Sequence, residues 1–391
     1  GGNSLLGPAG RHFQDVWQHR VGGHLDGLAV VVPEWTPPLA KKEVVMSKIN
    51  VGIAGTGFMA VAHLKAYRQL DNVRVAALCN PSGRNLDGDF SDVFGNIGDD
   101  EPIKLDMDGV KAFHDYGEML ADNDIELIDI TTPTVLHHEQ ALAALHAGKH
   151  VLCEKPLART SAQAREIVEE TKKSKGFFMP AMCLRFWPEW AWVKSAVDDG
   201  RFGQVLSARF RRVAEAPAWG QSNFLDGEKS GGGLLDLHIH DADFVLHCFG
   251  WPKGIYAQGH TKVSGQIDHV MAQYEFEDGA AISAEGSWAM TKGFGFNMSY
   301  TVNFERATVD FDIAREEEPL KLFQESKEPQ TLKLDEPDGY TGQITHLLEA
   351  IETGQPPTRV TPEDGLRSVE LCEAAKQSIE AGGTVPLWPN T

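Results

Sequence analysis

The sequence predicts an α/β protein with two domains: an N-terminal domain built on a parallel sheet and a C-terminal α/β domain with an open, largely antiparallel sheet. Three observations predict it. Between residues 49 and 184, short apolar runs alternate with helical patterns, which is typical of parallel sheets with crossover helices. After Pro188 the chain changes to stretches in which apolar and polar residues alternate, as in antiparallel strands. The length of 391 residues allows a sizeable core in each domain.

The first domain is expected to span residues 46–185 and the second residues 186–391, whose last helices could pack back on the first domain. Residues 1–45 contain glycines and prolines, which interrupt regular secondary structure, and show no sustained hydrophobic periodicity. We interpret them as an extension outside the fold: a tag, a leader or a disordered segment. A targeting peptide is the competing interpretation.

Within the first domain we expect six strands separated by helices. The strands are predicted at residues 49–54, 73–79, 110–114, 125–131, 150–153 and 177–184, and the helices at 58–70, 116–122, 134–146 and 161–175. Residues 85–109 are acidic and lack the spacing of a calcium loop, so a solvated helix and loop is predicted there.

In the second domain, a helix at residues 189–198 precedes the alternating stretches. Strands are predicted at residues 205–213, 254–262, 269–276, 280–290, 297–304, 307–313, 320–324 and 330–334, and closing helices at 341–353 and 362–381.

Composition excludes several classes of partner. The net charge of -20 argues against nucleic acid and against an anionic membrane surface, since both need a basic patch. No run approaches the roughly 20 apolar residues of a membrane span. The five cysteines are odd in number and form no CxxC pair, which favours a reducing compartment, and hence a cytoplasmic protein.

A glycine-rich turn follows the first predicted strand and opens a helix. Gly55-x-Gly57-x-x-Ala60 fits the dinucleotide-binding fingerprint in its proper context of strand, turn and helix. The glycines let the backbone approach a pyrophosphate, and the helix N-terminus supplies N–H groups. The pattern predicts a Rossmann domain, with cofactor contacts from the turn residues Gly55, Thr56, Gly57, Phe58 and Met59.

The end of the second strand bears on the choice of cofactor. A site for NAD commonly places an acidic residue there, on the ribose hydroxyl. Here the residue is Asn80, which removes a charge that would repel a 2′-phosphate, and Ser82 and Arg84 could bind that phosphate. NAD and NADP both remain open, with an exposed loop charge as the alternative for Arg84.

A lysine stands at the carboxyl end of the fifth strand, in Cys153-Glu154-Lys155-Pro156. Open α/β sheets hold ligands at this edge. The Lys155–Pro156 bond can be cis, which would fix the direction of the lysine. A surface lysine at a strand end is the alternative interpretation.

A second group of polar residues follows Gly231-Gly232-Gly233. Asp236, His240, Asp243 and His247 have helical spacing, which predicts one shared helical face. An aspartate four residues before a histidine can orient the imidazole and raise its basicity, as a general base requires. His238 and His240 would not chelate one metal ion on a helix, because residues two apart point in different directions. A solvated polar face is the other alternative.

Taken together, these segments resemble the glucose-fructose oxidoreductase/inositol dehydrogenase (Gfo/Idh/MocA) family from about Lys48 to Leu387. The resemblance rests on the order and spacing of Gly52–Gly57, Thr132-Pro133 with His137, Ala147–Ala158, Arg185–Pro188, Gly200–Gly203, Gly231–Asp243 and Thr361–Gly365.

By this resemblance, Lys155 would bind the substrate hydroxyl beside the nicotinamide, and His240 would accept the proton with help from Asp236. Thr132, Pro133, His137, Glu154 and Pro156 would contribute to the cofactor site, and Arg185 would lie on the substrate side. Asn80 and His238 depart from the family pattern. His238 would add a polar group facing the pocket.

The expected function is therefore NAD(P)-dependent hydride transfer to or from a sugar, cyclitol or related polyol. Alternatives are a glycosidase that uses tightly bound NAD transiently, a non-catalytic sensor and, more weakly, a metal hydrolase; no resident metal is predicted. The substrate itself is unspecified. The pocket would draw on loops such as residues 214–230, with Trp219 and Phe224; Trp219 could stack on a sugar face or could belong to the core. A homodimer or homotetramer through the open sheet face is expected.

Overall fold

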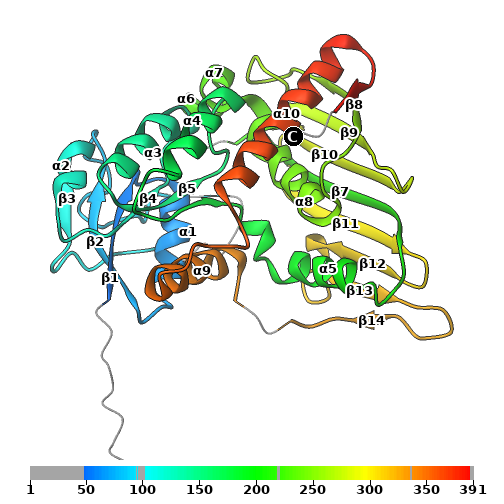
Figure 1. Cartoon of the computed structure of the whole chain (residues 1–391), viewed down its shortest axis with the longest axis horizontal. Helices are drawn as coiled ribbons and strands as arrows, with labels where there is room; N and C mark the ends of the chain where they lie inside the picture. The colour runs from blue at the N-terminus through cyan, green and yellow to red at the C-terminus, as the bar shows by residue number, and fades with distance from the viewer. Residues whose placement is uncertain (1–47, 94, 96–101, 218–220, 335–336, 388–391) are drawn as a thin grey trace, which may run out of the picture. The chain divides into compact units, whose positions relative to one another are not determined.

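The computed structural model describes residues 48–93, 95, 102–217, 221–334 and 337–387. The predicted extension at residues 1–45 and the predicted substrate contact Trp219 lie outside the described residues. The described part contains a six-stranded and a nine-stranded sheet, each with helices packed against it (Figure 1).

The six-stranded sheet is entirely parallel, in the order β3-β2-β1-β4-β5-β6. Its strands are β1 Ile49–Ala54, β2 Val73–Cys79, β3 Lys111–Phe113, β4 Leu127–Ile130, β5 His150–Glu154 and β6 Phe178–Ala181. The strand order reverses between β1 and β4, and ligands of such sheets bind outside the carboxyl ends at this point. β6 ends earlier than predicted because Cys183–Arg185 forms a 3-10 turn.

Helices cover both faces of this sheet. α1 (Phe58–Tyr67) and α9 (Gly339–Thr353) share one core with the sheet, while α3 (His137–His146) and α4 (Ser161–Thr171) pack into the core of the opposite face. α2 (Tyr116–Ala121) lies between β3 and β4 in the chain. α9 comes from the last part of the chain, so the first sheet is completed by a distant segment.

The nine-stranded sheet has the order β14-β13-β12-β11-β7-β10-β9-β8-β15. Its strands are β7 Val205–Glu215, β8 Gly254–His260, β9 His269–Glu275, β10 Ala281–Met290, β11 Phe296–Phe304, β12 Thr308–Asp312, β13 Leu320–Phe323, β14 Gln330–Thr331 and β15 Val385–Pro386. The predicted antiparallel character is confirmed for every neighbouring pair except β7 and β10, which are parallel. One face is covered by α5 (Pro188–Asp199), α8 (Ile239–Phe249) and α10 (Pro362–Ala381).

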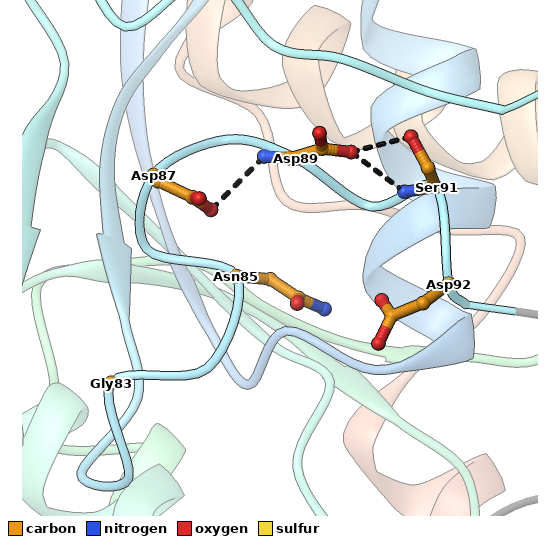
Figure 2. Close-up of a pocket in the computed structure, with 6 residues that line it drawn as sticks. All are labelled: Gly83, Asn85, Asp87, Asp89, Ser91 and Asp92. Carbon is orange, nitrogen blue, oxygen red and sulfur yellow. Dashed lines mark hydrogen bonds between the residues drawn. The ribbon is translucent and has the colours of Figure 1, made fainter.

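The acidic segment after β2 contains no helix in its described residues, so that part of the prediction is wrong. Leu86, Phe90 and Ile103 are buried, and this burial folds the segment into turns rather than a solvated helix. Figure 2 shows how its carboxylates are used locally: Asp87 accepts the N–H of Asp89 at 3.2 Å, and Asp89 accepts the N–H of Ser91 at 3.0 Å.

The described residues contain no group of three His, Cys, Asp or Glu side chains arranged to hold a metal ion. None of their helices is both long and apolar enough to cross a membrane.

Candidate active site

A cavity of about 690 Å³ opens at the carboxyl ends of β1, β2, β4 and β5, and residues of the second sheet and its helices close its other side. The predicted site residues in its lining are Gly55, Thr56, Gly57, Phe58, Met59, Asn80, Arg84, Thr132, Pro133, Glu154, Lys155, Asp236 and His240. Its size is in the range of small-molecule and cofactor sites.

The glycine turn is shaped for close approach. Gly55 has φ +92°, and a Cβ there would lie 2.9 Å from the backbone oxygen of Thr131. A Cβ on Gly57 would meet no atom of the described chain within 4 Å. α1 starts directly after Gly57 without a side-chain cap from the described residues, so its first N–H groups stay available to an anionic ligand. The turn therefore fits the pyrophosphate of a dinucleotide.

Asn80 organises the turn after β2. Its Nδ2 donates to Thr56 Oγ1 at 2.5 Å, and its Oδ1 accepts the Ser82 hydroxyl at 2.9 Å. Arg84 forms a surface ion pair with Asp92 at 3.1 Å. Ser82 is exposed on the same turn but is outside the cavity lining. This turn offers hydroxyl, amide and guanidinium donors and no carboxylate at position 80, so it accommodates NAD or NADP.

Lys155 reaches across the cavity from the end of β5. Its Nζ donates to the backbone oxygen of Asp236 at 2.9 Å and lies 3.2 Å from Asp236 Oδ1. The Lys155–Pro156 bond is cis, as the sequence allowed. The lysine and aspartate therefore form one ion pair that joins the two halves of the cavity wall.

His137 and Pro156 are behind this wall and do not line the cavity. The His137 ring nitrogens are 2.7 Å from the Pro156 oxygen and 2.8 Å from the Thr132 oxygen. Burial lowers the pKa of His137. The histidine ties together two loops that do line the cavity, rather than contacting a ligand itself.

The predicted contact between Asp236 and His240 is not formed. Residues Leu234–His238 adopt a π-helical turn before α8, which breaks the i, i+4 alignment expected of a regular helix. Asp236 turns to Lys155, and His240 Nδ1 is buried with no hydrogen-bond partner among the described residues. Burial, followed by the charges of Lys155 and Arg212, lowers the pKa of His240 well below its usual value. His240 is thus a neutral imidazole beside the Lys155–Asp236 pair.

The other two members of the predicted polar face, Asp243 and His247, do not line the cavity. Asp243 is buried and pairs with Arg185, with Arg185 Nη2 2.7 Å from Asp243 Oδ1. Neither residue lines the cavity, and His247 is also outside it. The π turn removes Asp236 from the predicted shared face, whereas His240, Asp243 and His247 keep their helical spacing in α8, and of these three only His240 lines the cavity. Arg185 belongs to a buried ion pair instead of the substrate side of the cavity.

His238 is buried with its Nε2 3.1 Å from the Tyr274 hydroxyl, and it does not reach the cavity. The predicted extra polar group in the pocket is therefore wrong. Since His240 lines the cavity, the two histidines occupy different surroundings and do not form a chelating pair.

Sequence reasoning missed several lining residues that have no motif. Trp288 and Phe296 form an apolar wall with Phe224, which belongs to the segment 214–230 that was expected to border the pocket; the Phe224 and Trp288 rings are 6.2 Å apart. Arg212 lies in the wall of the cavity, with its Nε 3.0 Å from Asp241 Oδ2, and Tyr340 enters from α9. These positions are ordinary strand or helix residues in sequence, and only the tertiary fold brings them to the cavity.

Comparison with known proteins agrees with this architecture. Residues 49–182 match the family described as an oxidoreductase family with an NAD-binding Rossmann fold, and residues 190–310 match the GFO/IDH/MocA C-terminal domain. The chain belongs to the Gfo/Idh/MocA family. The family resemblance seen in the sequence is therefore confirmed, as is the Rossmann fold of its first part.

Among Gfo/Idh/MocA relatives, the myo-inositol 2-dehydrogenase of Thermotoga maritima is 26% identical over 354 residues, covering 87% of this chain and 98% of its own. The 1,5-anhydro-D-fructose reductase of Ensifer adhaerens is 32% identical over 284 residues, covering 70% of this chain and 83% of its own. A solved levoglucosan dehydrogenase in complex with NADH has a TM-score of 0.73 at 22% identity, covering 88% of this chain and 100% of its own. That structure supports the fold alone.

Proposed function

We propose that the protein is an NAD(P)-dependent oxidoreductase that transfers a hydride between the nicotinamide and a hydroxyl or ketone carbon of a sugar, cyclitol or related polyol. The observation that carries the proposal is the meeting of neutral His240 with the Lys155–Asp236 pair in the same cavity as the glycine turn. The named relatives, an inositol dehydrogenase and an anhydrofructose reductase, act on this class of molecule.

The cofactor is NAD or NADP, and when bound it supplies the hydride chemistry. Gly55, Gly57 and the first N–H groups of α1 would hold its pyrophosphate, and the Asn80 turn would contact the ribose. The loop at Thr132-Pro133 would complete this half of the site.

The protein's own residues would handle the proton and the developing charge. In the oxidation direction, a ring nitrogen of His240 accepts the proton of the substrate hydroxyl, which requires a neutral imidazole. The Lys155 ammonium stabilises the alkoxide electrostatically. Asp236 holds Lys155 in place through the 3.2 Å contact. Its role is then to position the lysine, rather than to orient His240 as the sequence suggested.

Kinetics with a panel of cyclitols and sugars test this function. His240→Asn and Lys155→Met should each lower kcat for polyol oxidation by about 10²- to 10⁴-fold. The unfolding midpoint should stay unchanged in His240→Asn and fall in Lys155→Met, because the largely buried Asp236 loses its cation. His247→Asn is the matched control, since it removes a histidine of the same helix that is outside the cavity. Full turnover in the His240 and Lys155 variants would refute the assignment. Hydrolysis of a glycoside without net cofactor reduction would favour the glycosidase alternative.

The proposal also covers the domain boundaries, the cellular location and the oligomeric state of the protein. We infer a nucleotide-binding domain at residues 46–185, a substrate-binding and oligomerisation domain at 186–391 and a cytoplasmic location. The face of the nine-stranded sheet opposite α8 carries exposed Met271 and Gln273 beside Arg209 and Glu285. A homodimer or homotetramer would bury this face, and sedimentation of a Met271→Lys variant tests that arrangement.

A further inference from the structure

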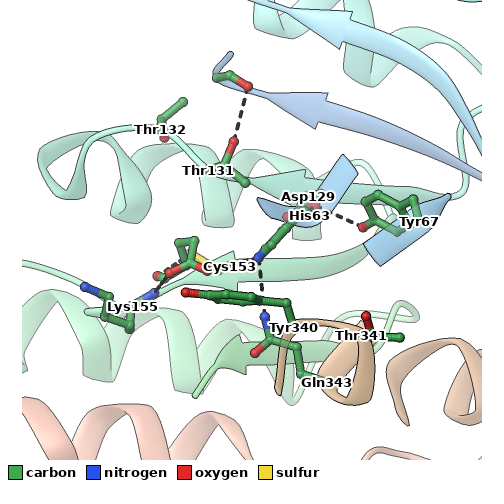
Figure 3. Close-up of polar contacts among 12 residues, drawn as sticks. His63, Tyr67, Asp129, Thr131, Thr132, Cys153, Lys155, Tyr340, Thr341 and Gln343 are labelled. Atoms are coloured by element: carbon green, nitrogen blue, oxygen red, sulfur yellow. Dashed lines mark hydrogen bonds and ion pairs between the residues drawn. The ribbon is translucent and has the colours of Figure 1, made fainter. Parts of the chain in front are cut away.

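A buried cluster of charged groups lies directly behind the cavity, and the mechanism above does not use it. Its centre is His63 of α1, which is flanked by Asp129 of β4 and Glu154 at the end of β5. His63 Nδ1 is 2.8 Å from Asp129 Oδ2 (Figure 3). His63 Nε2 is 3.1 Å from Glu154 Oε1. The exposed fractions of the three residues are 0%, 0% and 4%, so water does not screen these contacts.

The geometry determines the charge of the imidazole. An ionised carboxylate only accepts hydrogen bonds, so a histidine held between two of them must donate from both ring nitrogens. Burial alone lowers the pKa of His63, but the charge of Asp129 and the hydrogen bonds to both carboxylates outweigh burial and raise the pKa to about 10. His63 is therefore an imidazolium at neutral pH.

Tyr67, and Gln343 once its amide is reversed, are compatible with this protonation state. The Tyr67 hydroxyl donates to Asp129 Oδ2 at 2.9 Å, and the Tyr340 ring is 6.1 Å from the imidazole ring. Gln343 Nε2 lies 3.3 Å from His63 Nε2, which would set two donors against each other if the ring is an imidazolium, and Gln343 Oε1 has no partner among the described residues. Exchanging the oxygen and nitrogen of this amide would give the imidazolium another acceptor and satisfy the oxygen.

Glu154 connects the cluster to the cavity. It lines the cavity, and its Oε2 accepts the backbone N–H of Lys155 at 3.1 Å. One carboxylate thus contacts the buried His63 on one side and the backbone of Lys155 on the other. His63 itself is outside the cavity lining.

We propose that His63 is a positioning residue whose permanent imidazolium charge holds Glu154 as an oriented carboxylate in the cavity wall beside Lys155. The inference rests on the proposed function only in that the cavity is taken to bind the nucleotide. Without the cation, Asp129 and Glu154 would be two buried like charges, and such a pair cannot remain fully ionised. One of them takes up a proton, and the cavity wall becomes sensitive to pH.

Two measurements test the proposal. Nitrogen NMR of wild-type protein labelled at histidine should show one imidazole that keeps both ring protons to about pH 9, and whose signal is missing in His63→Gln. The affinity for NADH or NADPH, whichever the wild type binds, is then measured by fluorescence between about pH 6 and pH 9. His63→Gln should gain a pH dependence of up to about tenfold per pH unit, the limit for one linked proton.

Tyr67→Phe is the matched control, because it removes a hydrogen bond to Asp129 and leaves every charge in place. It should keep the wild-type pH profile. Asp129→Asn, by contrast, removes the largest contribution that raises the pKa of His63 and should itself introduce a pH dependence. A neutral imidazole in the wild-type spectrum at pH 7 overturns the proposal, and so do indistinguishable profiles for His63→Gln and Tyr67→Phe. If His63→Gln does not fold, the wild-type spectrum still decides. Absence of nucleotide binding by the wild type refutes the proposed function and leaves the spectrum of His63 interpretable.

Discussion

Replacing Arg185 by methionine separates a substrate role from a structural one. The sequence placed this arginine on the substrate side, whereas the structure places it in a buried ion pair with Asp243. Arg185 Nε and Nη2 donate to the two Asp243 oxygens at 2.9 and 2.7 Å, and the two side chains are only 4% and 1% exposed. Arg185 Nη1 also lies 3.1 Å from Asp364.

The expected cost follows from what the substitution leaves behind. Asp243 would keep the Ser368 hydroxyl at 2.9 Å as its remaining side-chain donor among the described residues. Removing one partner of a buried pair costs about 3–5 kcal/mol, because the remaining charge is uncompensated. The free energy of unfolding from urea titration should fall by this amount in Arg185→Met. The KM for the polyol should change little, since Arg185 does not line the cavity.

A double variant tests the origin of the loss. Arg185→Met combined with Asp243→Leu removes both charges, so it should be more stable than the sum of the two single losses predicts, by about 0.5–3 kcal/mol. The reasoning fails if the free energy of unfolding of Arg185→Met is within about 1 kcal/mol of the wild-type value while its KM for the polyol rises tenfold or more. That result would return Arg185 to the substrate site.

Three further predictions concern the nucleotide site and pH. Gly55→Ala should lower the free energy of unfolding by about 1–3 kcal/mol, because Gly55 has a positive φ and a Cβ there would contact the Thr131 backbone. Gly57→Ala should leave the unfolding midpoint unchanged and weaken nucleotide binding. Equal unfolding midpoints in the two variants would contradict this reasoning. Asn80→Asp should shift the ratio of NADH to NADPH affinity toward NADH, measured by fluorescence titration, and an unchanged ratio would show that Asn80 does not select the cofactor. The pKa of His63 is raised to about 10, so its stabilising contribution is complete below the ordinary value near 6.5 and is lost as pH rises toward 10. The urea midpoint should therefore fall between about pH 7 and pH 10 in the wild type and fall less in His63→Gln.

The first sheet was predictable because its signals are local. Each strand is a short apolar run, and the turn at Gly55–Gly57 contains glycines, of which Gly55 adopts the positive φ that the turn requires. The fingerprint and Lys155 also follow from strand ends, since the carboxyl ends of parallel strands meet at one edge. These parts of the cavity needed no knowledge of distant contacts.

The failures arose where distant contacts decide local geometry. The spacing of Asp236 and His240 implies a regular helix, but the segment adopts a π turn and Asp236 pairs with Lys155, far away in sequence. Arg185 and Asp243 carry no local sign that they will pair inside the protein. Likewise, Trp288 and Phe296 are strand residues whose sequence pattern does not distinguish them from other core positions, so their place in the cavity lining could not be predicted.

The single parallel pair in the nine-stranded sheet has a consequence for how this site can change. Adjacent parallel strands must be joined by a crossover, and the crossover from β7 to β10 carries Phe224, Asp236 and His240 before it continues through α8, β8 and β9. α8, β8 and β9 are fixed by core packing and strand pairing, whereas the stretch between Glu215 and Gly231 contributes no strand to the sheet in its described residues. Segments grafted between Glu215 and Gly231 should therefore alter which polyol the cavity accepts without disturbing the sheet, which makes this crossover the natural place to redesign specificity.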